Sequence, residues 1–172
     1  GPQSAGSYPG PICYDQGGEA PTVTDADLVL GYIDPDYYFG GNMMLNKEKA
    51  EEAIKTKLAD PLGLSVPDTA LLIRKIVDNH MAAAIRKEIN LRGYDPREFV
   101  LFAVGGGGPT HVAGYMGDIP TAMAFPFSPV FSALGSSVMD IMHIYEASKR
   151  YMVMEPGTAQ FNTNFDEFNH EV

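Results

Sequence analysis

Glu98-Phe-Val-Leu-Phe-Ala-Val-Gly-Gly-Gly-Gly-Pro-Thr-His-Val-Ala-Gly-Tyr-Met116 is the stretch that decides the fold of this chain. Its apolar run, 99–104, is rich in β-branched and aromatic residues and stops at four glycines, which predicts a buried strand and a sharp turn. Pro109 and Thr110 then predict the start of a helix, capped by Thr110 or by the glycine before Pro109. This arrangement places backbone N–H groups against an anion, or flat backbone against a planar ring.

The elements on both sides of this stretch predict an α/β fold. Apolar residues at helical spacing indicate helices over 46–59 and 67–91, capped by Asn46 and Ser65, and a second strand is expected over 121–125. In the longer helix, Leu72, Ile76 and His80 are expected on the apolar face, and Arg74 and Asp78 on the solvated face. A short helix over 112–116 connects the two strands, and such a crossover favours parallel pairing beneath covering helices. A last helix is expected from 127 to 150.

The chain is expected to be a single fragment of one domain. Its parts are a turn-rich segment over 1–45, a helical segment over 46–97, the strand–glycine turn–helix unit over 98–150 and a tail over 151–172. The first residue is not Met and the chain begins in the middle of a turn-rich segment, so we expect a piece of a longer protein.

The charge balance excludes several classes of partner. A formal net charge of −10 argues against nucleic acid and against an anionic membrane surface, because both attract clustered Lys and Arg. No run approaches the ~18 apolar residues of a membrane span, and no signal-peptide pattern opens the chain. The single Cys13 cannot form an intrachain disulfide, which fits a reducing, cytoplasmic setting.

Several other residues have both a structural and a functional interpretation. Thr24 is expected to cap a short helix with Asp25 in its first turn, and the alternative makes Asp25 a ligand of metal-bound water or of a hydroxyl. The aromatic turn over 34–41 is expected to pack on the core, with a binding surface as the alternative. Residues 1–23 are a frayed terminus or an ordered loop around a site. His80 is expected to pack on the apolar face of its helix.

Two common nucleotide motifs are absent from the sequence. No Lys follows Gly105–Gly108, so the turn is not a P-loop. No acidic residue ends a second strand ~20 residues on, so a dinucleotide fold is disfavoured. His143 and Glu146 lie one helical turn apart without further ligands, and no metal site is predicted.

Six ordered motifs resemble the C-terminal part of the ATPase subunit of the hydantoinase A/oxoprolinase family. They are Gly1-Pro-Gln-Ser-Ala-Gly6 with Pro9-Gly-Pro-Ile-Cys-Tyr14, Gly17-Gly18, Pro21-Thr-Val-Thr-Asp-Ala26 with Leu30-Gly31, Phe39-Gly-Gly41, Ala103-Val-Gly-Gly-Gly-Gly-Pro-Thr-His111 and Phe131-Ser-Ala-Leu-Gly135. The four-glycine form and the segment Met139-Asp-Ile-Met-His-Ile-Tyr-Glu146 are most similar to the β subunit of ketone carboxylases of the acetone carboxylase type.

The resemblance implies a lobe of the actin/sugar-kinase/Hsp70 ATPase fold, with the helices over 46–59 and 67–91 as its helical insertion. The cofactors it implies are ATP and Mg²⁺. It places Gly105, Gly106, Gly107 and Gly108 against the adenosine, with Thr110 or His111 near the nucleotide. The phosphate-binding hairpins of that fold are missing, so the chain is expected to hold at most half of a nucleotide site.

The implied reaction is ATP-dependent carboxylation, in which phosphorylation of a ketone enol and of bicarbonate leads to a β-keto acid. The partners implied are a hydantoinase-B-like subunit, a small third subunit, a ketone and bicarbonate. Alternatives are an ATP-dependent hydantoinase or 5-oxoprolinase, which hydrolyses an amide, and a non-catalytic subunit-interaction domain. Catalytic residues are expected outside this chain. His111 as an acid or base competes with helix-start packing, and Asp25 and Thr24 are second candidates.

Overall fold

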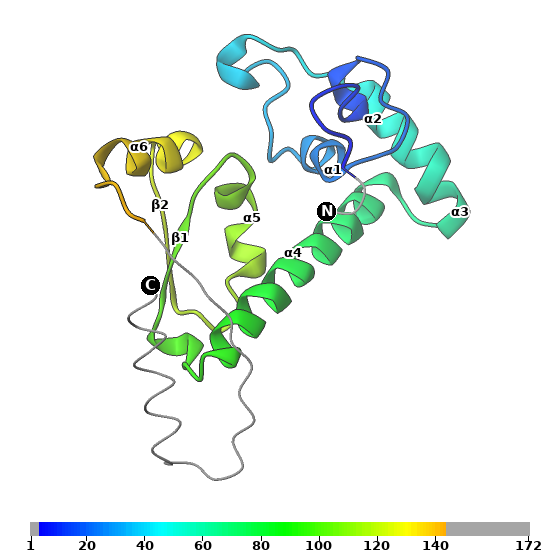
Figure 1. Ribbon diagram of the computed structural model, residues 1–172. Helices are drawn as coiled ribbons and strands as arrows, with labels where there is room; N and C mark the ends of the chain where they lie inside the picture. Colours follow the sequence, from blue (N-terminus) through cyan, green and yellow to red (C-terminus); the bar gives the residue numbers. More distant parts are fainter. Residues whose placement is uncertain (1–3, 144–172) are drawn as a thin grey trace, which may run out of the picture. The chain divides into compact units, whose positions relative to one another are not determined.

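The computed structural model describes residues 4–143 (Figure 1). The chain divides into two compact units, Gly1–Ala133 and Leu134–Val172. The predicted tail over 151–172 and the end of the predicted last helix lie outside the described residues. Within 4–143, no helix is both long enough and apolar enough to cross a membrane.

The N-terminal segment forms an ordered loop around Ile12 and Cys13, which are both buried. A short 3₁₀ turn, Ile12–Tyr14, precedes helix α1 (Val23–Val29), and Cys13 packs with Leu28 and Ala50 in a buried cluster. Helix α1 is capped by Thr22, which exchanges hydrogen bonds with Asp25 in a capping box. The prediction of Thr24 as the cap was therefore wrong, because the chain enters the helix two residues earlier.

The predicted helix over 46–59 is longer than expected. Asn46 caps α2 (Lys47–Ile54) as predicted, by accepting a hydrogen bond from the Lys49 amide. A π-helical turn, Lys55–Ala59, leads directly into the short α3 (Asp60–Leu62). Pro61 does not stop the helix, because it occupies the first turn of α3, where a missing N–H costs little.

Helix α4 (Val66–Leu91) begins at the predicted cap, Ser65, but buries a different face from the one predicted. Arg74 and Asp78 are buried, whereas Leu72, Ile76 and His80 are exposed. The prediction placed Arg74 and Asp78 on the solvated face, and it was wrong because both have partners on other helices. The packing of His80 on the core is likewise contradicted.

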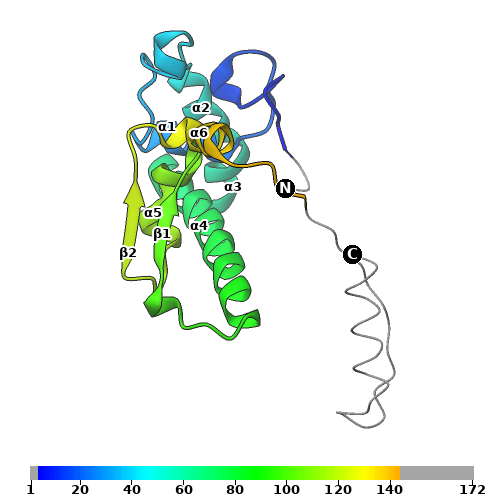
Figure 2. The same cartoon turned by 60° about the vertical axis from the view of Figure 1, so that its left-hand side comes forward.

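Strands β1 (Val100–Ala103) and β2 (Thr121–Ala124) pair in parallel, as predicted, with Val100 opposite Thr121. Helix α5 (Gly107–Tyr115) contacts both β1 and α4, so it lies between the sheet and α4 (Figures 1 and 2). The fold class is therefore α/β. Strand β1 was predicted to be buried, and this is wrong for one of its faces. Helix α5 covers one face of the sheet, whereas Val100 and Phe102 are exposed on the other.

After β2 the chain forms a 3₁₀ turn, Ser128–Val130, and helix α6 (Phe131–Val138). The rings of Phe125, Phe127 and Phe131 stack there, with centroids 5.0–5.9 Å apart. The predicted helix over 127–150 is wrong for 139–143, which follow the end of α6 without helical structure. Its remaining residues, 144–150, lie outside the described part.

Candidate functional site

The glycine turn begins where β1 ends, and Ser128 holds it in place. The Gly105 amide donates to the Ser128 carbonyl over 2.8 Å. The buried Ser128 hydroxyl donates to the Ala103 carbonyl over 3.0 Å and accepts from the Phe125 amide over 2.8 Å. One serine therefore ties the ends of both strands to the first glycine. Gly105 itself has a φ of +80°, a conformation that favours glycine.

Helix α5 starts inside the glycines rather than at Thr110. Gly106 occupies the cap position without a side-chain hydrogen bond, and Gly107 is the first helical residue. Pro109 falls in the first turn, as predicted, and Thr110 is one residue further along the helix. The amides of Gly107 and Gly108 lie in the first turn, where the helix has no preceding carbonyl to accept from them. They are therefore available to a ligand.

Gly106 and Gly107 are not explained by the structure around them. Gly106 has an ordinary helical conformation, with φ −70° and ψ −51°, which any residue can adopt. A Cβ added at Gly106 or Gly107 would meet no heavy atom within 4 Å. Glycine is a poor helix former, so Gly107, the first helical residue, costs stability without a return in packing. The space beside these two residues fits a group from outside the described residues, such as a ligand.

A cleft of about 750 Å³ opens on this turn. Its volume lies in the range typical of small-molecule sites. Its lining includes Gly106 and Pro129, and the N-terminal loops supply the remaining lining residues, Ser7, Tyr14, Gln16, Tyr38, Phe39, Gly40 and Met43. The lining is mostly apolar and aromatic, and it includes no charged side chain.

The aromatic residues of the turn over 34–41 were predicted to pack on the core, and the structure bears this out for one of the three. Tyr38 packs there together with Tyr14, and their hydroxyls share a hydrogen bond of 2.7 Å. Tyr37 and Phe39 are 71% and 78% exposed, so the packing prediction is wrong for both. Burial and the hydrogen bond with Tyr38 raise the pKa of Tyr14, which therefore remains a neutral hydroxyl rather than a base.

A network of buried ionisable side chains surrounds His111, three residues after the last glycine of the turn. His111 Nδ1 lies 2.7 Å from Asp78 Oδ1, and Nε2 lies 2.9 Å from Asp27 Oδ2. Arg74 Nη1 lies 2.5 Å from Asp27 Oδ1. Each ring nitrogen of His111 thus faces one carboxylate group, and the Arg74 guanidinium supplies a positive charge beside Asp27.

The network connects α1 and α4 to α5, the helix that begins in the glycine turn. Arg74 also donates to the Thr110 carbonyl and lies over the Tyr32 ring, with its guanidinium carbon 3.8 Å from the ring centroid. Asp27 belongs to α1, Arg74 and Asp78 to α4, and Thr110 and His111 to α5. His111 is only 5% exposed and both its nitrogens are occupied, which favours the packing interpretation over proton transfer to a ligand.

Sequence reasoning missed Asp27, Arg74 and Asp78. One signal was available: Arg74 and Asp78 form an i,i+4 pair of opposite charge, and both share the helix face of Ile73 and Val77. Their partners on α1 and α5 are distant in the sequence, and nothing local identifies them.

Asp25 has a structural role. Its carboxylate accepts from the amides of Cys13 and Thr22 and from the Thr22 hydroxyl, each over 2.8 Å, and from the Ile12 amide over 3.3 Å. The capping interpretation is therefore confirmed over the ligand alternative. Within residues 4–143, no group of three or more His, Cys, Asp or Glu residues is placed to hold a metal ion.

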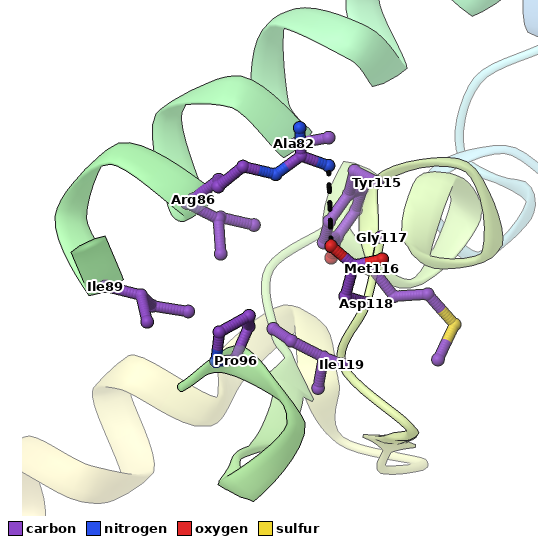
Figure 3. A pocket seen from close by; sticks show the side chains of 10 residues that line it. Ala82, Arg86, Ile89, Pro96, Tyr115, Met116, Gly117, Asp118 and Ile119 are labelled. Carbon is purple, nitrogen blue, oxygen red and sulfur yellow. Dashed lines mark ion pairs between the residues drawn. The ribbon is translucent and has the colours of Figure 1, made fainter. Parts of the chain in front are cut away.

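A second hollow, between the C-terminal half of α4 and the turn before β2, is too small for a ligand (Figure 3). It has a volume of about 10 Å³, which is room for a single water molecule. Arg86 and Asp118 form an ion pair of 3.8 Å at its edge. The cleft at the glycine turn is therefore the stronger candidate of the two.

The glycine turn lies at the carboxyl end of the first strand of a parallel α/β crossover, which is where open α/β sheets generally bind their ligands. The chain belongs to the hydantoinase/oxoprolinase family, whose family model matches residues 1–145. This confirms the family to which the sequence motifs pointed.

Within the family, the chain is similar to subunits of ATP-dependent enzymes. It is 61% identical, over its whole length, to 24% of the acetophenone carboxylase gamma subunit of Aromatoleum aromaticum. It matches a nucleotide-free structure of acetone carboxylase with a TM-score of 0.76 and 38% identity, over 81% of this chain and 20% of that one. The ATP-dependent caprolactamase of Pseudomonas jessenii matches with a TM-score of 0.72 and 40% identity, over the same shares. The chain thus spans about a fifth to a quarter of the length of these relatives.

Proposed function

We propose that this chain is part of an ATP-dependent ketone carboxylase subunit and supplies the adenosine-binding half of its nucleotide site. The observation that carries the proposal is the unexplained glycine at position 106, which lines a ligand-sized cleft and has open space where a Cβ would lie. Flat backbone without side chains lets a planar ring approach closely. Gly105, Gly106, Gly107 and Gly108 form this platform.

Each residue at the turn has a distinct part in the proposal. Gly105 turns the chain away from β1, and Gly106 and Gly107 offer bare backbone to the nucleoside. The amides of Gly107 and Gly108 are free to donate to it. Thr110 and His111 fix the position of the turn, since Arg74 donates to the Thr110 carbonyl and two carboxylates contact the His111 ring. When bound, ATP supplies the phosphoryl groups that activate the carbonyl substrate.

The comparisons favour ketone carboxylation over amide hydrolysis. Identity to the acetophenone carboxylase subunit is 61% over the whole chain, against 48% over 65% of it for caprolactamase subunit alpha. A ketone and bicarbonate are therefore the proposed substrates. An ATP-dependent amide hydrolase of the hydantoinase or oxoprolinase type is the second candidate, supported by the caprolactamase match. A purely structural domain between subunits is the third.

The remaining parts of the proposed enzyme lie outside the described residues. Mg²⁺ is proposed as the second cofactor of the full-length subunit, bound with the phosphates of ATP. The proposed partners are a hydantoinase-B-like subunit and a small third subunit. A reduced, buried Cys13 fits the cytoplasm as the setting.

Calorimetric titration of ATP into the full-length subunit, wild type and Gly106→Val, tests the platform. The valine side chain would enter the cleft, so we expect ATP to bind at least about tenfold more weakly, without a fall in melting temperature. Equal ATP affinity in the two proteins would remove the platform. The reaction is tested separately in the assembled enzyme: ATP consumption driven by acetophenone and bicarbonate supports the carboxylase, and consumption driven by caprolactam supports the amide hydrolase.

A further inference from the structure

We infer that Tyr14, Tyr38 and Phe39 form a second wall of the nucleotide site, which stacks on the adenine ring from the side opposite the glycine turn. We call these three residues the aromatic wall. The inference rests on the proposed function, and it adds the residues that would recognise the base. The aromatic wall and Gly106 line the same cleft, although more than 60 residues separate them in the sequence.

Phe39 has a conformation that packing does not explain. Its φ is +52°, which is a strained value for a bulky residue, and Gly40 and Gly41 follow with φ of +67° and +80°. The side chain is nevertheless 78% exposed, so the strained turn holds it at the cleft rather than in the core. Strain of this kind is typical of residues that meet a ligand.

Tyr14 and Tyr38 give the wall a fixed frame. Their rings lie 5.7 Å apart at an interplanar angle of 46°, and both pack on the buried cluster of Cys13, Leu28, Leu45 and Ala50. Their two hydroxyls use only one proton in their shared hydrogen bond. The second proton is free to donate, and the ring nitrogens of adenine and the ribose hydroxyls are suitable acceptors.

The charges around the cleft indicate which part of a ligand it takes. None of its lining residues is charged, so it suits neither bicarbonate nor a phosphate group. At the glycine turn the cleft reaches the first residues of α5, whose amides are free to donate. An uncharged aromatic wall beside free amides matches the base and the ribose of a nucleotide, which carry several acceptors. An aryl ketone matches the wall but offers a single acceptor, its carbonyl oxygen.

Phe39→Ala and Tyr37→Ala in the full-length subunit form the test. Tyr37 is a matched control, because it is two residues away and comparably exposed but does not line the cleft. Stacking of a base on an aromatic side chain is lost in Phe39→Ala, so we expect the dissociation constants of ATP and of adenosine to rise roughly tenfold or more. Tyr37→Ala should leave both unchanged, and Phe39→Trp should restore them.

Three results would overturn the inference. ATP and adenosine could bind Phe39→Ala as tightly as wild type. The variant could raise the KM for acetophenone with ATP affinity unchanged, which would assign the wall to the ketone. It could also lower the melting temperature alone, which would assign Phe39 to packing against another part of the subunit. If Gly106→Val weakens ATP binding and Phe39→Ala does not, only the aromatic wall fails; if neither does, the proposed function fails with it.

Discussion

Arg74 shows how one residue connects the helical part of the chain to the glycine turn. Its guanidinium contacts Asp27 on α1, approaches Asp78 on its own helix and donates to the Thr110 carbonyl on α5. Arg suits this position because it presents several N–H donors in a fixed plane. A buried network of this kind contributes less net stability than its number of contacts suggests, but losing one member is costly.

Arg74→Met is expected to lower the free energy of unfolding by about 3–5 kcal/mol, because Asp27 and Asp78 then lose their buried cation. Arg74→Lys keeps the charge but not the planar set of donors, so its loss should be smaller. Urea unfolding of the full-length subunit measures both. Arg86→Met is the matched control on the same helix, since its ion pair with Asp118 is exposed, and it should change stability by less than about 1 kcal/mol. Equal losses for Arg74→Met and Arg86→Met would contradict the network's importance.

Cys13 gives a prediction about pH. Burial, followed by the nearby Asp25 carboxylate, raises the pKa of the Cys13 thiol. A raised pKa favours the protonated folded state, so stability is unaffected below the pKa of the unfolded thiol, about 8.5. Above it, the free energy of unfolding should fall by about 1.4 kcal/mol per pH unit. Melting curves from pH 7 to pH 10 measure this slope, and Cys13→Ala should remove it. A thiol that reacts rapidly with a disulfide reagent in the folded protein would contradict this account.

At the scale of elements, α4 and α5 approach each other closely where Gly114 faces Asp78. A Cβ at Gly114 would lie 2.9 Å from the Asp78 Cβ and 2.0 Å from its Oδ2. Neither distance is tolerable, and the Asp78 Cβ cannot move without its helix. The glycine therefore permits the contact that brings His111 to Asp78.

Gly114→Ala should lower the free energy of unfolding by about 1–3 kcal/mol, because the two helices must separate. Alanine ordinarily stabilises a helix, so the sign of the change is diagnostic. Chemical denaturation supplies the measurement, and Gly135→Ala is a suitable control, since a Cβ there meets nothing within 4 Å. A Gly114→Ala protein as stable as Gly135→Ala would show that α4 and α5 are not this close.

The sequence predicted the helices and strands better than the contacts between them. Asn46 and Ser65 were recognisable as caps, because capping depends on residues within one turn. The strand–turn–helix–strand order predicted the parallel pair. The buried pairing of Asp27 with His111 was not predictable, because 84 residues separate them and each reads locally as an ordinary polar residue. The start of α5 inside the glycines was missed for the opposite reason, since propensity alone argues against it.

The candidate site was predicted in part. The sequence drew attention to the glycine turn, and the structure places Gly106 on a cleft. Binding by Gly105–Gly108, Thr110 and His111 stays a prediction. The turn over 34–41 was predicted to pack on the core, with a binding surface as the alternative, and only the fold shows that Phe39 is exposed at that cleft.

At the scale of the whole molecule, one face of the sheet remains uncovered within the described residues. Val100, Phe102 and Met123 share that face and are about half exposed. Two strands with an exposed apolar face are marginally stable alone. The relatives are about four times as long as this chain, so other parts of the full-length subunit are available to cover this face.

Residues 1–172 expressed alone should therefore bind the dye ANS strongly, because contiguous apolar surface is accessible. Phe102→Ser, on the uncovered face, should reduce the signal in the isolated chain. The full-length subunit should bind much less dye per molecule. Equal ANS fluorescence from equimolar full-length subunit and isolated chain would contradict coverage of this face.

The central claim is that the glycines at 106 and 107 serve a nucleotide and not the fold. The most direct test measures the melting temperature and the ATP dissociation constant of the Gly106→Ala/Gly107→Ala double variant of the full-length subunit, beside Gly135→Ala. The prediction is a melting temperature equal to or above that of wild type, together with at least about tenfold weaker ATP binding, whereas Gly135→Ala binds ATP normally. Unchanged ATP affinity in the double variant, or a drop in melting temperature that accompanies the lost binding, would contradict the claim.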